Sequence, residues 1–378
     1  TSAPSPKEKL ATPSTAADTA EAPERRMSKA FIIGRGVIGL TTARALVVQG
    51  FSVIVVGEKK LSETTSAGAG GLWMPFHCEP AADVARWSAD SYDLYLAEND
   101  RECIEVLPAL HLFAASQPPP PPVWATKRIK FESVGDHGVE AALRRRGSQA
   151  HVPAGYGSAW LWDTVVVDAP RYLQKLEQFL ERTDEAKFES GHVRDLDDAL
   201  KMAFDRECDV LVNCAGLGGP NFSKGDETVG ARGVVMQFHR PPGDTVVITT
   251  DQGPLALNEH EPAYQIPRGD VVVVGGSYDE GKVGDATEDE IKRISRNANA
   301  LSGGAVVSLK QTWVGYRPVR PGGVRLEVER HADGTIVAHN YGHGGSGWTV
   351  ALGCADDLVC MITKEDFYHS DKSPPTAT

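Results

Sequence analysis

The chain has 378 residues, of which 41% are hydrophobic and 24% are charged, a composition typical of a folded globular protein. A single hydrophobic core stops growing at roughly 250–300 residues, so this length predicts two domains. The formal net charge of −12 disfavours nucleic acid or an anionic membrane as the main partner. Apolar runs are strand-sized and broken by glycine, so the sequence predicts no membrane-spanning helix.

The two ends of the chain have the composition of tails. Residues 1–27 are rich in Pro, Ala, Ser and Thr and show no apolar periodicity, so we expect a disordered tail or a processed leader. Residues 367–378 are expected to be a C-terminal tail, and they do not end in a Ser-Lys-Leu type address. The sequence therefore predicts a soluble protein and leaves a cytoplasmic or a peroxisomal location open.

The first folded segment, "KAFIIGRGVIGLTTARALVVQGFSVIVVGEKK", predicts a strand, a tight turn, a helix and a second strand. Gly34 permits the turn, Gly36 lets the backbone approach a pyrophosphate, and Gly39 lets the helix pack on the strand. Backbone N–H groups at the start of the helix can bind phosphate, and Glu58 can bind a ribose diol. This fingerprint predicts an adenine dinucleotide held by Gly34, Gly36, Val37, Ile38, Gly39, Glu58 and Lys59.

The next stretch, "SETTSAGAGGLWMP", has no regular period and is expected to be a loop that wraps a flat cofactor. A helix is predicted over 82–98, followed by an extended proline run at 118–122. Alternating patterns over 245–277 predict antiparallel strands, and strand–helix patterns return towards the C-terminus. We therefore expect an α/β fold in which a Rossmann-like dinucleotide-binding domain is interleaved with a β-rich antiparallel substrate domain.

Side-chain catalytic motifs are missing from the sequence. It contains no G-x-S-x-G elbow, no H-E-x-x-H zinc motif and no Walker lysine, so a cofactor rather than a catalytic side chain is expected to react. The six cysteines form no C-x-x-C pair and have no histidine at zinc spacing, which indicates free thiols and no metal site and leaves one disulfide open. Redox chemistry is the class of reaction that this pattern favours.

A second glycine-dense segment, "HNYGHGGSGWTVALGCADDLV", lies near the C-terminus and bears on the choice between flavin and nicotinamide. Its glycines free backbone N–H groups. A helix that begins near Trp348 can direct its positive end at the electron-rich edge of an isoalloxazine ring. The segment therefore favours FAD over a nicotinamide cofactor.

Seven blocks in this order resemble the D-amino acid oxidase and D-aspartate oxidase family: "IIGRGVIGL", "TTSAGAGGLWMP", "VNCAG", "GARGVVMQ", "YQIPRG", "GYRPVRPGGVRLE" and "HNYGHGGSGWT". They span nearly all of residues 29–360. The resemblance implies non-covalent FAD and hydride transfer from the α-carbon of a D-amino acid to flavin N5, without an enzyme base. The imino acid would hydrolyse to a 2-oxo acid and ammonia while O₂ is reduced to hydrogen peroxide. A homodimer is left open.

The resemblance also implies roles for single residues. Arg317 matches the family's carboxylate clamp, a role that suits the fork of a guanidinium. Tyr264 matches the tyrosine that shares the carboxylate, and the Gly345 carbonyl matches the acceptor of the substrate amine. His260 stands where many members carry a lid tyrosine, and is expected to be either a pH-sensitive lid residue that contacts substrate or an exposed loop histidine. The matched cofactor contacts are Thr64, Thr65, Ser66, Gly70, Gly71, Leu72, Val193, Ala215, Gly216, Arg317, Gly345, Ser346, Gly347, Trp348 and Thr349.

The domains implied by these blocks are discontinuous. The FAD-binding domain is expected at about 28–78, 160–220 and 310–366. The substrate domain is expected at about 79–159 and 221–309.

The side-chain pocket is expected to be apolar, because Met74 and Phe76 follow Trp73 where more polar side chains are common in the family. An acidic substrate would need extra cations, for which Arg268 and His77 are the nearby candidates. We therefore expect neutral D-amino acids as substrates. Acidic D-amino acids, an FAD dehydrogenase with another electron acceptor and a flavin-binding protein without catalysis remain alternatives.

Overall fold

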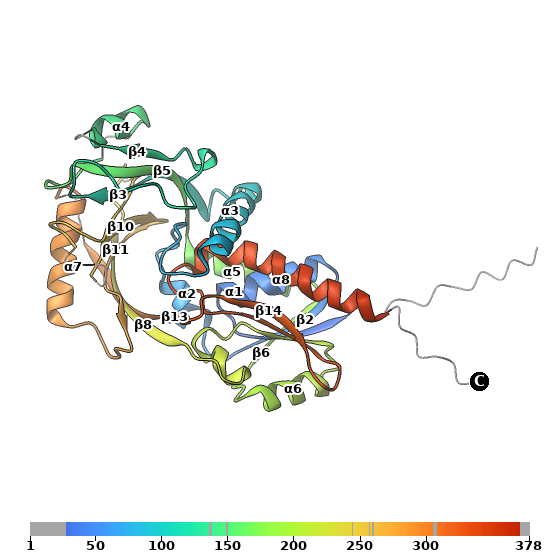
Figure 1. Ribbon diagram of the computed structural model, residues 1–378. Coiled ribbons are helices and arrows are strands. Elements are labelled where there is room, and N and C mark those ends of the chain that lie inside the picture. Colours follow the sequence, from blue (N-terminus) through green and yellow to red (C-terminus); the bar gives the residue numbers. More distant parts are fainter. Residues whose placement is uncertain are drawn as a thin grey trace, which may run out of the picture.

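The computed structural model describes residues 28–370, except 136–137, 149, 244, 257, 259–260 and 305–307. In Figure 1 a sheet marked by β2, β6 and β14 and a sheet marked by β3, β5, β10 and β11 occupy different halves of the molecule. His260 and the predicted N-terminal tail lie outside the described residues. Residues 367–370, predicted to begin the C-terminal tail, instead belong to the last helix, α8 (Gly347–Ser370).

The first sheet is largely parallel, as the fingerprint predicts. Its order is β14 (Arg325–Arg330), β15 (Ile336–Tyr341), β7 (Val210–Asn213), β1 (Lys29–Ile33), β2 (Ser52–Gly57) and β6 (Ala186–Ser190). Only the β14–β15 pair among these described strands is antiparallel. A parallel strand buried on both faces needs continuous apolar sequence, which "KAFII", "SVIVVG" and "VLVN" supply.

Helices cover both faces of this sheet. Ile32 of β1 packs with α1 (Val37–Val48), α5 (Ala169–Glu181) and α8, whereas its neighbour Phe31 packs on the other face with α6 (Leu196–Asp205). This alternation follows from the two-residue period of a strand. α3 (Ala81–Glu98), predicted over 82–98, lies against α8 (Figure 1).

The second sheet is mainly antiparallel, although β3 and β9 pair in parallel. It contains β12 (Asp279–Glu280), β8 (Val229–His239), β11 (Val271–Gly275), β10 (Ala263–Arg268), β9 (Val247–Thr250), β3 (Ile104–Phe113), β5 (Ser158–Val167) and β4 (Glu132–Val134), with β13 (Leu309–Val319) paired to β8. α7 (Glu288–Leu301) and α4 (Val139–Arg145) close a core on one face. The fold class expected from the sequence, a Rossmann-like part with a β-rich part, is confirmed. Within the described residues, no helix has both the length and the apolar character needed to cross a membrane.

The stretch 62–75, expected to be an irregular loop, is partly helical. It contains the single turn α2 (Thr65–Gly68), which begins after Thr64; the Thr64 hydroxyl accepts a hydrogen bond from the Ala67 N–H at 3.3 Å. One turn is too short to show a helical period, and only this capping chemistry marks it. Short 3₁₀ turns also occur at η1 (Leu61–Glu63), η2 (Lys127–Ile129) and η3 (Gly216–Phe222).

The domain division remains a prediction. Most of β5 and β13 falls inside the ranges expected for the FAD-binding domain, yet both strands pair with strands of the second sheet. All six cysteines are free thiols, and Cys360 is the exposed one among them.

Candidate active site

A cavity of about 540 Å³ lies where the carboxyl ends of β1, β2 and β7 face the strands β8, β10 and β13 of the second sheet. Open α/β sheets bind ligands at this edge, because helix N-termini and strand ends converge there. The volume is within the usual range for cofactor and substrate sites, roughly 300–1,000 Å³. The cavity is therefore the candidate active site.

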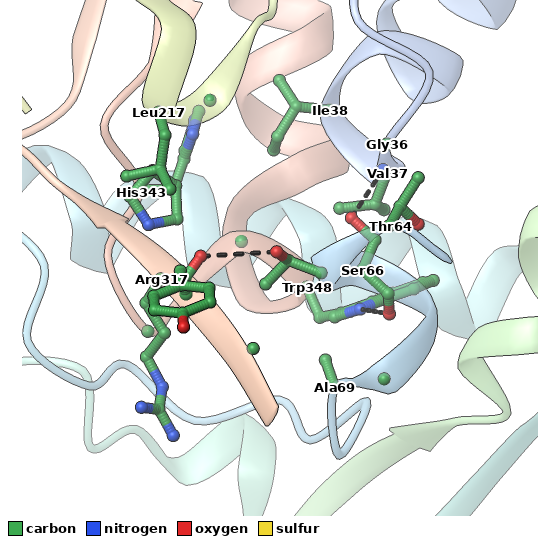
Figure 2. A pocket seen from close by; sticks show the side chains of 18 of the residues that line it. Gly36, Val37, Ile38, Thr64, Ser66, Ala69, Leu217, Arg317, His343 and Trp348 are labelled. Carbon is green, nitrogen blue, oxygen red and sulfur yellow. Dashed lines mark hydrogen bonds between the residues drawn. The ribbon is translucent and has the colours of Figure 1, made fainter. Parts of the chain in front are cut away.

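Most of the residues predicted for the site line this one cavity, although they come from both ends of the chain. They are Gly34, Gly36, Val37, Ile38, Glu58, Lys59, Thr64, Thr65, Ser66, Gly70, Gly71, Leu72, Val193, Ala215, Gly216, Tyr264, Arg317, Gly345, Gly347 and Trp348. Gly39, Ser346 and Thr349 do not line it. In the view of Figure 2, Leu217, His343 and Arg317 lie on one side, and Gly36, Thr64 and Ser66 on the other.

The first glycine turn is packed too tightly for side chains. Gly34 has a φ of +115°, and a Cβ there would lie 2.3 Å from the Cys214 carbonyl oxygen. A Cβ on Gly39 would lie 1.9 Å from the Gly34 carbonyl oxygen. Gly39 thus serves the packing of α1 on β1 rather than the wall of the cavity, in agreement with the fingerprint's third glycine.

Ser66 joins the two glycine segments. Its hydroxyl accepts a hydrogen bond from the Val37 N–H at 3.0 Å, and its carbonyl accepts one from Trp348 Nε1 at 3.1 Å, as Figure 2 shows. The first segment supplies the start of α1 and the second supplies the start of α8. One short turn thereby holds two helix N-termini at the same cavity, where they favour negative charge.

The hydroxyls of Ser346 and Thr349, two predicted cofactor contacts, hydrogen-bond to the protein backbone. The buried Ser346 hydroxyl donates to the Phe76 carbonyl at 2.9 Å and accepts from the Phe76 N–H at 2.7 Å. The Thr349 hydroxyl accepts from the Met74 N–H at 3.1 Å and donates to its carbonyl at 3.0 Å. Both side chains therefore fasten α8 to the backbone of 74–76 instead of facing the cavity.

Two buried polar atoms on the cavity wall have no hydrogen-bond partner among the described residues, Asn340 Oδ1 and His343 Nε2. Burial lowers the pKa of His343 to about 3, so the ring is neutral near pH 7. A buried unpaired polar atom costs about 1–3 kcal/mol, which a ligand with hydrogen-bonding groups can recover. Together with the two helix N-termini, these atoms fit a large polar cofactor such as FAD. Both residues stand in the quoted glycine segment, but the sequence did not single them out.

The side chains of Arg317 and Tyr264 meet on the face of the second sheet that lines the cavity. The Arg317 guanidinium lies over Gly233, donates to the Ser277 carbonyl at 3.1 Å and lies 5.5 Å from the centre of the Tyr278 ring. Burial raises the pKa of Tyr264, and the charge and hydrogen bond of Arg317 oppose this rise. The described contacts of Arg317 are thus a carbonyl, a ring and a phenol, which leave its charge available to a carboxylate.

Arg268 and His77, the candidates for contact with an acidic substrate, do not line the cavity. Arg268 is buried and donates to the Ala69 carbonyl, and the His77 ring stacks on Tyr278 with centroids 4.4 Å apart. The cavity is also lined by residues that the sequence reasoning missed, among them His111, Thr249 and Asp251.

The fold and this site define a class of protein: a two-sheet oxidoreductase whose cavity is lined by the glycine fingerprint of a dinucleotide site. The sequence profile described as FAD dependent oxidoreductase, or DAO, matches residues 29–361. The chain belongs to this family and is a FAD-dependent oxidoreductase of the D-amino acid oxidase type.

Relatives agree with this assignment. The chain is 30% identical to a D-amino-acid oxidase of Rubrobacter xylanophilus over 89% of its own length and 96% of that protein. It is 26% identical to the D-aspartate oxidase of Homo sapiens over 88% of its own length and 94% of that protein. Among solved structures, glycine oxidase from Bacillus cereus shares the fold with a TM-score of 0.69 at 16% identity, covering 93% of this chain and all of that one (100%).

Proposed function

We propose that the protein oxidises D-amino acids. A D-amino acid, O₂ and water would give a 2-oxo acid, ammonia and hydrogen peroxide. The observation that carries the proposal is the meeting of Arg317 and Tyr264 on the wall of the cavity that also holds the glycine fingerprint. The relatives named D-amino-acid oxidase support it.

In this proposal the chain's own residues bind and orient the substrate. The guanidinium of Arg317 and the hydroxyl of Tyr264 bind the α-carboxylate, and the Gly345 carbonyl accepts a hydrogen bond from the amine. A substrate held by both its carboxylate and its amine reacts faster, because its orientation towards the cofactor is already set. The chemistry that FAD supplies when bound is acceptance of a hydride from the α-carbon at N5, followed by reoxidation by O₂.

The proposed substrates carry side chains without negative charge. Leu72, Met74 and Phe76 give the cavity an apolar wall. Arg268 and His77 are turned to other partners, as described above, so they offer no cation to an acidic side chain. This arrangement favours neutral over acidic D-amino acids, despite the similarity to a D-aspartate oxidase.

The test is a peroxide assay of the FAD-loaded protein with a panel of D-amino acids, with the L-enantiomers as controls. We expect peroxide from neutral D-amino acids and none from their enantiomers. Arg317→Ala should lower kcat/KM about 100-fold, the effect of removing one partner of a charged hydrogen-bonded pair. Turnover with an artificial electron acceptor but without peroxide would favour a dehydrogenase, and no turnover of any D-amino acid would contradict the proposal.

A further inference from the structure

A polar group of three residues lines the cavity on β3, on β9 and just after β9. These residues are His111 of β3, Thr249 of β9 and Asp251. His111 is paired with Thr249, which is in turn paired with Tyr264 of β10, and all four residues line the cavity. His111 Nδ1 lies 2.9 Å from the Thr249 hydroxyl, and His111 Nε2 lies 3.5 Å from the carboxylate of Asp251. The Asp251 carboxylate therefore lies at the cavity, beside the His111 ring.

The cavity wall carries charges of both signs near these residues. Arg317 lines the cavity, and Arg293, next to Tyr264 but outside the lining, donates to the Gly276 carbonyl at 2.8 Å and pairs with Glu261 at 3.7 Å. Asp251 also lines the cavity, and its pKa is lowered mainly by the hydrogen bond from His111, so it carries negative charge near pH 7. A ligand with an anionic and a cationic end matches this distribution.

The strand order separates the Tyr264 ring from Asp251 across the sheet. The Tyr264 ring lies over Gly275 of β11, and Asp251 follows β9, two strands away. Two strand spacings are about 10 Å. The cavity lining also contains apolar side chains, among them Leu72, Met74 and Ile266, along which an aliphatic side chain can pack.

We infer that the preferred substrates are D-amino acids whose side chain is aliphatic near the α-carbon and cationic at its end, the class of D-lysine and D-arginine, with Asp251 as the partner of the terminal cation. This inference rests on the proposed oxidation of D-amino acids and extends it to the far end of the side chain. Asp251 would repel an acidic side chain. A short side chain would not reach Asp251, so this carboxylate would gain no partner from the substrate.

His111 is a positioning residue in this arrangement. It is the only described partner of Asp251 in an ion pair, and its other nitrogen is held by Thr249. An incoming cation would compete with His111 for the carboxylate. Removal of His111 should therefore strengthen binding of a cationic side chain, whereas removal of the Asp251 charge should weaken it.

The experiment compares kcat/KM for D-lysine with kcat/KM for D-norleucine, which has a similar length without the charge. We expect a ratio above one in the FAD-loaded wild-type enzyme, and a fall of about fivefold in Asp251→Asn, the upper range for losing one partly exposed ion pair. Asp184→Asn removes the charge of an exposed carboxylate in a turn outside the cavity and should leave the ratio unchanged.

His111→Asn provides a second measurement should Asp251→Asn fold poorly, and it should raise the ratio. A wild-type ratio of one or less, or a ratio that Asp251→Asn or His111→Asn does not move in the stated direction, would overturn the inference alone. Absence of peroxide from both substrates and from every other D-amino acid would instead overturn the proposed function.

Discussion

At the scale of single residues, Gly233 determines where the proposed carboxylate clamp can lie. A Cβ on Gly233 would lie 2.3 Å from Arg317 Nη1, because the guanidinium occupies the space above β8. Gly233→Ala should leave the fold intact, since the atom that must move is the end of a flexible side chain. It should displace Arg317 and raise KM for D-amino acids about tenfold, or about 1.4 kcal/mol, measurable by steady-state kinetics beside a thermal melt.

Gly230→Ala on the same strand is the matched control. A Cβ there would lie 3.5 Å from the Tyr316 ring, an ordinary contact, and Gly230 does not line the cavity. KM should be unchanged in this variant. An equal KM in Gly233→Ala and the wild type would show that substrate binding does not depend on this position of the guanidinium.

The sequence could indicate some of these residues and not others. Arg317 and Tyr264 stand in short motifs, so the resemblance points to them individually. His111 and Asp251 stand in "PALHLF" and "TTDQG", where a single polar residue has no pattern around it. Only the pairing of β3 with β9 brings the two together, and pairing between strands so far apart in the chain leaves no local signal.

At the scale of elements, α8 depends on two hydroxyls for its attachment to the backbone of 74–76. Ser346→Ala would leave the N–H and carbonyl of Phe76 without a side-chain partner, and Thr349→Val would do the same at Met74. Each variant should lower the free energy of unfolding by about 1–3 kcal/mol, measurable by urea titration. Cofactor affinity should also fall, because Trp348 lies between these residues.

Thr363→Val tests whether this loss is specific to the junction. Thr363 lies on the same helix, and its hydroxyl donates to the Val359 carbonyl of α8 itself at 2.9 Å. The variant should unfold like the wild type. An equally small effect in Ser346→Ala would mean that the hydrogen bonds at Phe76 do not stabilise the attachment of α8.

Helices and strands with a long apolar periodicity could be predicted from the sequence. A single turn, and contacts between segments far apart in the chain, could not. The β1–α1–β2 unit and α3 are where the sequence predicts them. α2 is a single turn, and the sequence places Ser346 and Thr349 among the cofactor contacts by resemblance without indicating what their hydroxyls bind. Their actual partners come from a segment about 270 residues earlier, as the sequence separations of 270 and 275 show.

At the scale of the whole molecule, acid should lower the free energy of unfolding over two pH ranges. Paired carboxylates determine the lower range, and a buried neutral histidine determines the higher one. Glu290 pairs with Arg232 between α7 and β8 at 2.7 Å, and Asp226 accepts hydrogen bonds from Arg320 at 2.9 Å and from Tyr341. These contacts hold the pKa of both carboxyls at about 2. Their contribution to stability is complete above the ordinary carboxyl range and is lost as the pH falls towards 2.

His343 lowers the stability of the fold at a higher pH than these carboxyls do, and in the same direction. Burial lowers its pKa from 6.5 to about 3, so between these values the unfolded chain binds a proton that the folded chain does not. The free energy of unfolding of the apoprotein should therefore fall as the pH is lowered from about 6.5 to 4.5, by up to about 1.4 kcal/mol per pH unit for one histidine. Urea titrations at several pH values measure this slope. His343→Gln should reduce it, whereas His239→Gln, on the exposed end of β8, should not. A slope that is the same in His343→Gln and the wild type would show that other groups take up the proton on unfolding.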